Sequence, residues 1–529
     1  MHTIRFLLLT HTYEDTVLDK RFRLLWHIHN QAVKFAQRRL HALFRDRAYI
    51  DAKKEYGSLQ KQIRSLARRL ETMEAGGVTD HKKHAAMKRE LAAAKRSQKA
   101  CKDILNERIE HFELTQTGFD KYVTVMQHRF AKNITSQQAQ KEAERVYTGV
   151  CKVLYGDGKF VHLKKLADQH TISQKCATNG VKVNMEAHVI EWLGLTVPFK
   201  IDMNNPYVAE GVSHTLKYGE IERLQFNNGW RYYLILYLDG PAPKKLNPDK
   251  PDGGSVTGID IGVSTVSSVS QNSVALQELS PQCAEYNRKI AREQRLIDSQ
   301  KRLGNPDNYD KDGQIKKGRH TWSLTEGCRR RQRKLRTLYC KKAATTEDSH
   351  NHQANELILD NGTEFIVEKM NFKGLQKRSQ KPTGRQEKTT EIKKKDGTTK
   401  TIRKCKRKKR FGKSLNDRAP SSFITILTRK AEQYGGQLVQ IKTAAFRASQ
   451  YQHDTDTCNK VELSDRWKTI DGHDIQRDLY SGFLLMCSNP EGTAPDRDLC
   501  LRYFDRFLEL HDAFIQKTSG MPHPACFGY

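Results

Sequence analysis

The chain has 529 residues, of which 37% are hydrophobic, 8% aromatic and 29% charged. This composition is typical of a protein with several packed domains and excludes an intrinsically disordered chain. Lys and Arg number 92 against 61 Asp and Glu, which gives a formal net charge of +31. So large an excess favours a nucleic-acid partner, because phosphates would relieve the self-repulsion. The alternative is a solvated basic surface without a partner.

The eleven cysteines predict neither disulfides nor a zinc ribbon, because their number is odd and no two form a C-x-x-C pair. The apolar start, Ile4 to Leu9, is too short for the apolar region of a signal peptide and is typical of a strand. No apolar run reaches the length of a membrane span. These features predict a cytoplasmic protein with reduced thiols.

The first half is predicted to be a β module interrupted by helices. Helical spacing of apolar residues, or a Lys- and Ala-rich composition, marks four segments: 25–43, 59–70, 81–108 and 136–146. From Val181 to Asp239 the pattern becomes strand-like, and residues 221–238 are expected to form a hairpin that turns at 227–229. Prolines between 241 and 251 form a stiff linker, which marks a domain boundary.

The second half has an α/β pattern. Strands are expected over 257–261, 364–368 and 437–441, and helices over 284–303, 325–359, 421–434 and 475–486. A basic stretch over 373–410 separates two of these elements and has almost no apolar residues. Its run Lys406, Arg407, Lys408, Lys409 and Arg410 is typical of a disordered loop or of a nucleic-acid-binding arm.

Three acidic residues stand out by their positions. Asp260 lies within the first strand of this half, Glu368 ends the second strand, and Asp478 falls in the first turn of the last helix. Each has an ordinary interpretation as a turn, strand-end or helix-start acid. If folding gathers the three, their mutual repulsion favours protons or a cation between them. Oxygen ligands suit Mg²⁺, or Mn²⁺, and two such ions support phosphodiester hydrolysis.

The motifs around these acids resemble the TnpB family of transposon-encoded nucleases, which is related to type V CRISPR effectors. The matching motifs are Gly258-Ile-Asp-Ile-Gly-Val, Val367-Glu-Lys-Met-Asn-Phe-Lys-Gly, Phe411-Gly-Lys-Ser-Leu-Asn, Lys430-Ala-Glu-Gln-Tyr-Gly-Gly, Ala448-Ser-Gln and Arg477-Asp-Leu-Tyr-Ser-Gly-Phe. The resemblance is specific from Gly258 to Met486. In the first half of the chain only the order of the predicted elements is similar. It implies that Asp260, Glu368 and Asp478 are the catalytic and Mg²⁺-binding residues.

The resemblance also implies a multi-domain α+β fold, in which an RNase H-like (RuvC) nuclease domain accompanies an N-terminal β-barrel module with an inserted helical lobe. The expected parts are 1–20 with 181–250 (β-barrel wedge), 21–180 (helical recognition lobe), 251–370 with 411–490 (nuclease), 371–410 (basic insertion), 451–474 (degenerate zinc ribbon) and 491–529 (C-terminal tail). The implied partners are a guide RNA and double-stranded target DNA, in a monomer or a dimer. Arg68, Arg69 and the run 406–410 are candidate phosphate contacts.

Two departures from the family pattern bear on the site. The expected ribbon keeps only Cys458, so we predict no zinc and expect apolar contacts to hold this segment. Tyr480 stands where the family usually has an asparagine near the metal. Asp471 and Asp474 lie nearby and are alternatives to Asp478 as the third ligand.

Two histidine pairs resemble other nuclease motifs. His27 and His29 fall in a helical pattern and are expected to be packed or on the surface, and His350 and His352 are expected to be solvated on an Arg-rich helix. Three alternative functions remain open: a type V effector that uses a CRISPR RNA, an RNA-guided repressor that does not cut, and a transposase that joins DNA ends.

Overall fold

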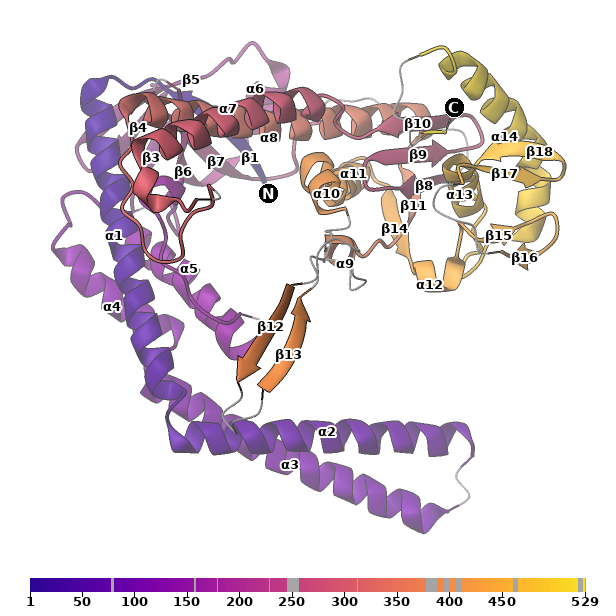
Figure 1. Ribbon diagram of the computed structural model, residues 1–529, viewed down its shortest axis with the longest axis horizontal. Coiled ribbons are helices and arrows are strands. Elements are labelled where there is room, and N and C mark those ends of the chain that lie inside the picture. The colour runs from indigo at the N-terminus through magenta and orange to yellow at the C-terminus, as the bar shows by residue number, and fades with distance from the viewer. Residues whose placement is uncertain are drawn as a thin grey trace. The chain divides into compact units, whose positions relative to one another are not determined.

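The computed structural model describes residues 1–529 except 78–79, 157, 178, 228, 245–255, 312, 377–387, 394–398, 405–410, 460–464, 522–526 and 529; for 388–393, 399–404 and 444 it describes the backbone alone. The chain is a mixed α+β protein that divides into two compact units, Met1–Ala242 and Pro243–Tyr529 (Figure 1). The prediction of a multi-domain α+β chain is confirmed at this level. None of the helices in the described residues has the length and apolar composition of a membrane span.

The first unit is built around a seven-stranded sheet. Its strands, in sheet order, are β2 (Thr171–Ile172), β6 (Thr215–Phe226), β7 (Gly229–Asp239), β1 (His2–Leu8), β5 (Leu195–Lys200), β4 (Val189–Trp192) and β3 (Lys182–Asn184). The hairpin of β6 and β7 contains the predicted one. An ideal Cβ on Gly219 of β6 would lie 3.2 Å from a methyl group of Val183 on β3, so the sheet folds back on itself. Its closure as a barrel stays a prediction.

Three helices pack on this sheet in one apolar core: α1 (Thr12–Leu43), α4 (Gln116–His128) and α5 (Ser136–Tyr155). Leu18, Phe22, Leu25 and Ile28 are fully buried, at the spacing that lines one face of α1. The short elements η1 (Leu166–Asp168) and α6 (Pro206–Val212) complete the unit.

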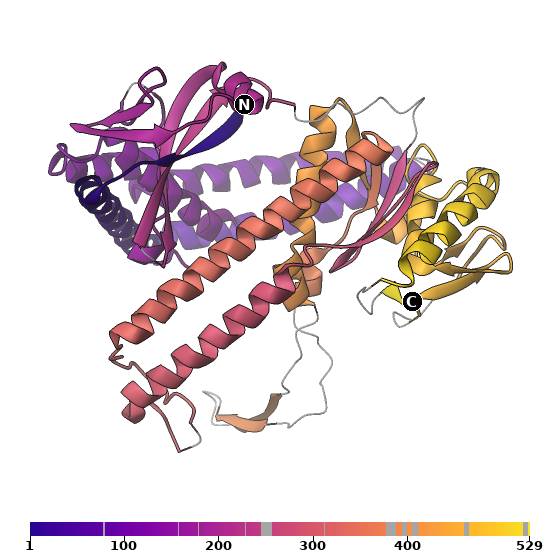
Figure 2. The ribbon, with the colours of Figure 1, turned by 90° about the horizontal axis from the view of Figure 1, so that it is seen from above.

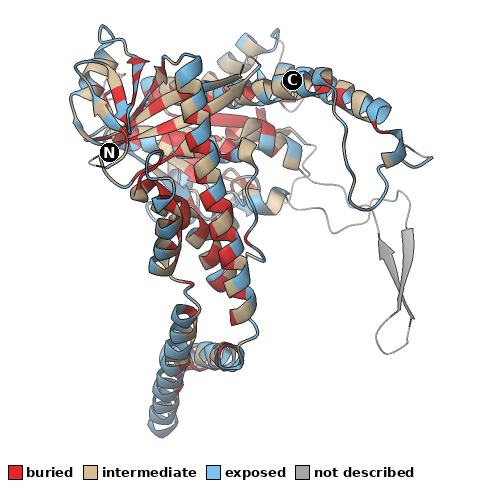
Figure 3. Ribbon diagram, turned by 90° about the vertical axis from the view of Figure 1, so that its left-hand side faces the viewer, coloured by how far each residue is buried: buried red, intermediate tan, exposed pale blue. Residues whose placement is uncertain are grey.

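The helices α2 (Arg47–Ala75) and α3 (His81–His111) form a long pair that is mostly exposed (the helical pair at the bottom of Figure 3). Their own core is narrow, with Leu66, Leu70 and Met87 as its buried members. Because so little apolar surface is covered, most side chains on this pair face water.

The second unit contains a five-stranded sheet with the order β10-β9-β8-β11-β14. These strands are β8 (Thr257–Ile261), β9 (Thr265–Val269), β10 (Val274–Glu278), β11 (Glu364–Glu368) and β14 (Gln437–Ile441). The first three form an antiparallel meander, whereas β11 pairs parallel with both β8 and β14.

Helices cover both faces of this sheet. One face holds α8 (Glu326–Asn361) and α11 (Pro420–Gln433), and the other holds α13 (Arg477–Met486), against which α14 (Arg497–Thr518) packs. Before α8 comes α7 (Cys283–Gly304), which lies antiparallel beside it (Figure 2). The remaining elements are η2 (Pro306–Asn308), α9 (Phe372–Gln376), β12 (Lys388–Lys393), β13 (Thr399–Lys404), α10 (Gly412–Arg418), α12 (Thr443–Phe446), β15 (Tyr451–Gln452), β16 (Thr457–Cys458), β17 (Trp467–Ile470) and β18 (His473–Gln476).

Two predictions made for this half need correction. Residues 491–529, expected to be a tail, contain the packed helix α14. His350, expected to be solvated, is fully buried beside the ring of Phe423, because it faces the sheet side of α8; His352 is exposed. The pair on α1 follows the prediction, since His29 is buried and His27 is exposed.

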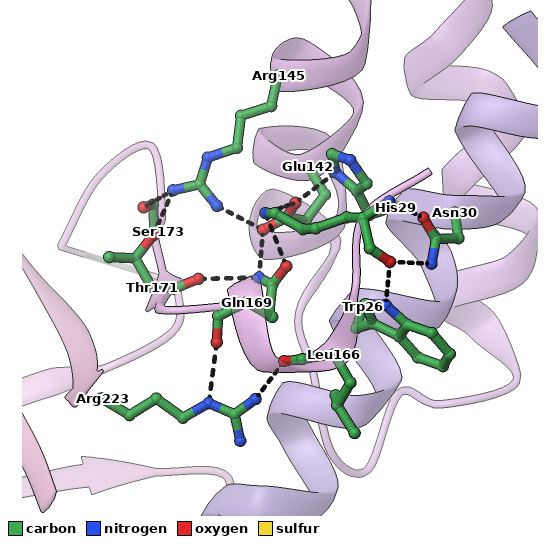
Figure 4. Close-up of polar contacts among 11 residues, drawn as sticks. Trp26, His29, Asn30, Glu142, Arg145, Leu166, Gln169, Thr171, Ser173 and Arg223 are labelled. Atoms are coloured by element: carbon green, nitrogen blue, oxygen red, sulfur yellow. Dashed lines mark hydrogen bonds and ion pairs between the residues drawn. The ribbon is translucent and has the colours of Figure 1, made fainter. Parts of the chain in front are cut away.

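A buried carboxylate links the helices of the first unit to its sheet (Figure 4). Glu142 on α5 is 1% exposed and lies 2.9 Å from Nδ1 of His29 and 2.5 Å from the guanidinium of Arg145. It also accepts a hydrogen bond from Gln169, whose carbonyl oxygen accepts one from Arg223 on β6. Burial alone would raise the pKa of Glu142, but the His29 hydrogen bond and the charges of Arg145 and Lys164 lower it to about 2.

We expect Glu142→Gln to destabilise the first unit by about 3 kcal/mol at neutral pH. The folded-state pKa lies below the ordinary value of 4.5, so this stabilisation is present above pH 4.5 and is lost as the pH falls toward 2. Urea unfolding at pH 7 and pH 3, followed by hydrogen exchange in α1 and α5, measures the difference. The control is Glu144→Gln on the same helix, where the carboxylate is about half exposed. Equal effects of the two substitutions would contradict the assignment.

Candidate functional site

The two strand acids lie on the same face of the second sheet. Ile259 and Ile261 of β8 point into the core beneath α8 and α11, and alternation along the strand turns Asp260 to the α13 side. The parallel register pairs Val367 with Ile259, so Glu368, one residue further along β11, comes beside Asp260. The sheet therefore places both predicted acids on neighbouring strands and on one face.

Helix α13 approaches β8 more closely than side chains would allow. An ideal Cβ on Gly258 would lie 2.0 Å from the carbonyl oxygen of Gly482 and 2.4 Å from the backbone nitrogen of Met486. Only a residue without a side chain fits at Gly258, and Gly482 faces it from the helix. This contact sets the depth at which the helix start carrying Asp478 sits on the sheet.

The first turn of α13 has two further anchors. Ser267 on β9 donates a hydrogen bond to the carbonyl oxygen of Asp478 at 2.6 Å. The side chain of Gln476 caps the helix by accepting from the backbone N–H of Leu479 at 2.8 Å. Asp478, like the two strand acids, keeps part of its surface in solvent while its neighbours in α13 are buried.

Two of the acids act electrostatically on the third, Asp260. Burial raises the pKa of Asp260 well above its usual range, and the charges of Asp478 and Glu368 raise it further, while Arg477 opposes them. Burial also raises the pKa of Glu368, against the hydrogen bonds that it accepts from the backbone of Ala448 and from the Thr443 hydroxyl. A cation near Asp260 would relieve this repulsion.

Each outer acid has a protein partner of its own. One carboxylate oxygen of Asp478 accepts from the guanidinium of Arg477 at 3.1 Å, and the other lies 3.7 Å from Arg466. Glu368 accepts from Ala448 at 3.1 Å. In the described part of the chain, no three His, Cys, Asp or Glu side chains lie close enough to hold one metal ion together. The donor chemistry and the backbone positions fit Mg²⁺, but Asp478 would have to exchange its arginines for the ion.

The alternative third ligands lie on the hairpin before α13. Asp474 is exposed on β18 and accepts a hydrogen bond from Thr469 at 2.8 Å, and Asp471 lies in the turn between β17 and β18. The carboxylates that raise the pKa of Asp260 are those of Asp478 and Glu368. The choice of Asp478 stays a prediction.

Tyr480 points away from the acids, into an apolar cluster. It is fully buried, and its hydroxyl lies 2.8 Å from Nδ1 of His453 and accepts from the His453 backbone N–H at 3.1 Å. Phe483 and Phe504 contact the His453 ring. The two hairpins β15–β16 and β17–β18 thus pack on α13 and α14 through this cluster, while Cys458 is exposed on β16.

The structure describes two of the predicted phosphate contacts and leaves the other five outside the described residues. Arg68 and Arg69 are exposed on α2, in the first unit. Lys406, Arg407, Lys408, Lys409 and Arg410 lie outside the described residues. Sequence reasoning did not assign roles to Arg466, Arg477 or Ser267. The sequence offered a signal for Arg477, because this residue directly precedes Asp478 in the final motif. Arg466 and Ser267 are brought to the site by tertiary packing alone.

Comparisons with known proteins give a weak structural likeness. No protein-family model and no curated protein matches the chain. A Cas12f1–sgRNA–target DNA complex contains a chain that aligns with a TM-score of 0.43 at 11% identity, over 93% of this chain and 99% of that one. A CRISPR–Cas12f ternary complex aligns over the same shares, with a TM-score of 0.28 at 12% identity. At these values the likeness carries no inference about activity or site residues.

We expect Gly258→Ala to lower the stability of the second unit by roughly 2–3 kcal/mol, because the three nearest atoms that the new methyl group meets all belong to the backbone of α13. The midpoint of thermal unfolding measures the loss. Gly327→Ala is the control, since its nearest atoms lie 3.8 Å away. A Gly258→Ala protein as stable as the control would show that the helix does not seat on β8 in this way.

We expect Tyr480→Phe to cost about 1–2 kcal/mol, because the buried backbone N–H of His453 loses its acceptor. Tyr480→Asn, which installs the residue usual in the family, removes the ring and should cost about 3–5 kcal/mol. Both are measured by urea unfolding. A zinc chelator should leave the wild-type transition unchanged, and a chelator-induced loss of stability would contradict apolar support of the hairpins.

Proposed function

We propose that this chain is an RNA-guided DNA endonuclease that hydrolyses phosphodiester bonds at a site formed by Asp260, Glu368 and Asp478 with Mg²⁺. The observation that carries the proposal is the placement of Asp260 and Glu368 on adjacent parallel strands, on the face of the sheet against which α13 sets Asp478. Three acids from separate segments have no structural reason to gather on this face of the sheet, although in the described residues their side chains do not come close enough to hold one ion together. A divalent cation gives them such a reason, because it converts their repulsion into binding.

The roles follow from the geometry. Asp260 and Glu368, fixed on adjacent parallel strands, would hold the ion from the sheet, and Asp478 would hold it from the helix. When bound, Mg²⁺ activates water and stabilises charge on the leaving oxygen. Arg477 and Arg466 neutralise Asp478 without the ion, and if the ion replaced them they could contact a phosphate of the substrate.

The nucleic-acid partners rest on charge and on motif resemblance. A net charge of +31 in a chain with exposed basic helices suits a long polyanion. The motifs from Gly258 to Met486 resemble the TnpB family, in which a guide RNA pairs with the target strand while the protein holds the heteroduplex. We extend this partner set, guide RNA and double-stranded DNA, to this chain.

A second candidate is an RNA-guided DNA-binding protein that does not cut. It is favoured by the ion pairs of Asp478 with Arg477 and Arg466, which keep this acid on protein partners. All three positions nevertheless remain acidic, and loss of an acid is the usual mark of such proteins. Cleavage assays separate the two candidates.

We expect Glu368→Gln to reduce Mg²⁺-dependent cleavage at least a hundredfold while RNA and target binding stay nearly unchanged, because the loss of one ligand removes several kcal/mol of metal stabilisation. The protein is expressed with its flanking locus, the copurifying RNA is sequenced, and matched plasmid DNA is cleaved. Asp474→Asn, on the exposed hairpin, is the control and should retain activity. Cleavage by the Glu368→Gln protein would contradict the assignment of the metal site. Purification without a specific RNA would contradict the proposal that the protein is RNA-guided.

A further inference from the structure

We infer that the outer end of the α7–α8 pair binds a single-stranded segment of nucleic acid. The surface consists of the described residues between the helices, 305–311 and 313–325, and the adjoining turns of both; we name it the α7–α8 cap. From the proposed function the inference takes only the class of partner. Figure 2 shows the loop between α7 and α8 at the end of the helical pair away from the sheet of the second unit. The three acids belong to β8, β11 and α13, so the cap is a separate contact.

The cap is an ordered loop. The side chain of Asn305, 8% exposed, donates to the carbonyl oxygens of Lys301 and Ser323 and accepts from the N–H of Ser323. Tyr309 and Ile315 form a β-bridge, and Asn308 donates to Thr321. These bonds hold the cap side chains in place before any partner arrives, which lowers the entropy cost of binding.

Aromatic rings gather on the cap. Tyr309 and His320 stand edge-on to Trp322, with ring centroids 5.9 and 6.3 Å away, and all three rings remain partly exposed. Leu303 and Ile315 next to them are 81% and 55% exposed. A loop that served only to close the helical pair would bury such side chains, so these favour a partner.

Cations alternate with the rings. The guanidinium of Arg302 lies 5.3 Å from the Tyr309 centroid, and the ammonium of Lys301 lies 5.7 Å from that of Trp322. Four more cations are exposed around them and form no ion pair within the described residues: Lys317, Arg319, Arg329 and Arg330. The surface thus combines positive charge with partly exposed aromatic faces.

This combination selects a single strand. Phosphates of any nucleic acid would match the cations, but a duplex hides its base faces in the stack. Unpaired bases can stack on Trp322 or Tyr309 while the backbone contacts the neighbouring cations. A duplex, or an acidic protein segment, would use the charges and leave the rings without a role.

The test uses the full chain in EDTA, so that binding is measured without cleavage. A ten-nucleotide single-stranded RNA carrying 5-iodouridine is cross-linked by light, and the attached peptides are identified. We expect cross-links at Trp322 or Tyr309, and Trp322→Ala should weaken single-strand binding roughly tenfold while leaving duplex binding unchanged. Cross-links confined to other segments, or tighter binding of the duplex to the cap, would overturn the inference.

A second variant removes exposed charges only, so its result does not depend on whether Trp322→Ala disturbs the fold of the cap. Lys317→Ala with Arg319→Ala removes two exposed cations and should lower the salt dependence of log K by roughly 1.4. Arg502→Ala with Lys517→Ala, two exposed cations of α14, is the matched control and should change it little. Equal changes in both pairs would overturn the inference. Failure of Mg²⁺-dependent cleavage would count against the proposed function and leave this result intact.

Discussion

The backbone contact between β8 and α13 is the constraint on which the second unit depends. Gly258 has no room for a side chain because the carbonyl of Gly482 occupies its place. A larger residue at Gly258 would lift the helix, and with it Asp478, from the sheet. The strand register then matters as much as the helix depth, since a slip of one residue in β11 would turn Glu368 to the opposite face.

Around this contact, each acid is balanced in a different way. Asp478 has two arginines, and Glu368 has a backbone N–H and a hydroxyl. The charges of Asp478 and Glu368 raise the pKa of Asp260, and Arg477 opposes them. The arrangement stores repulsion at Asp260, which a proton or a cation can relieve. Arg477 and Arg466 would therefore compete with a divalent ion, if one binds as proposed, for the carboxylate of Asp478.

Sequence periodicity predicted the long helices and the apolar strands, because α1, α8, β8 and β11 bury regular faces. It missed β9 and β10: three of the five residues of β9 are Thr or Ser, and their burial depends on neighbours that no local pattern reveals. The same limit applies to the site. The acids carried recognisable motifs, whereas the hydrogen bond from Ser267 to Asp478 joins residues 211 apart, and the contact of Tyr480 with His453 turns a position expected near the metal into core.

The narrow seam between α2 and α3 has a consequence for how this protein can vary. The buried members of its core are Leu66, Leu70 and Met87, so a few apolar contacts at coiled-coil-like spacing hold the two helices together. If seven residues are removed from or added to each helix, the apolar side of each helix still faces the other helix, because seven residues span nearly two turns. The reach of this arm can therefore change in increments of about 10 Å without disturbing the sheet or the network around Glu142.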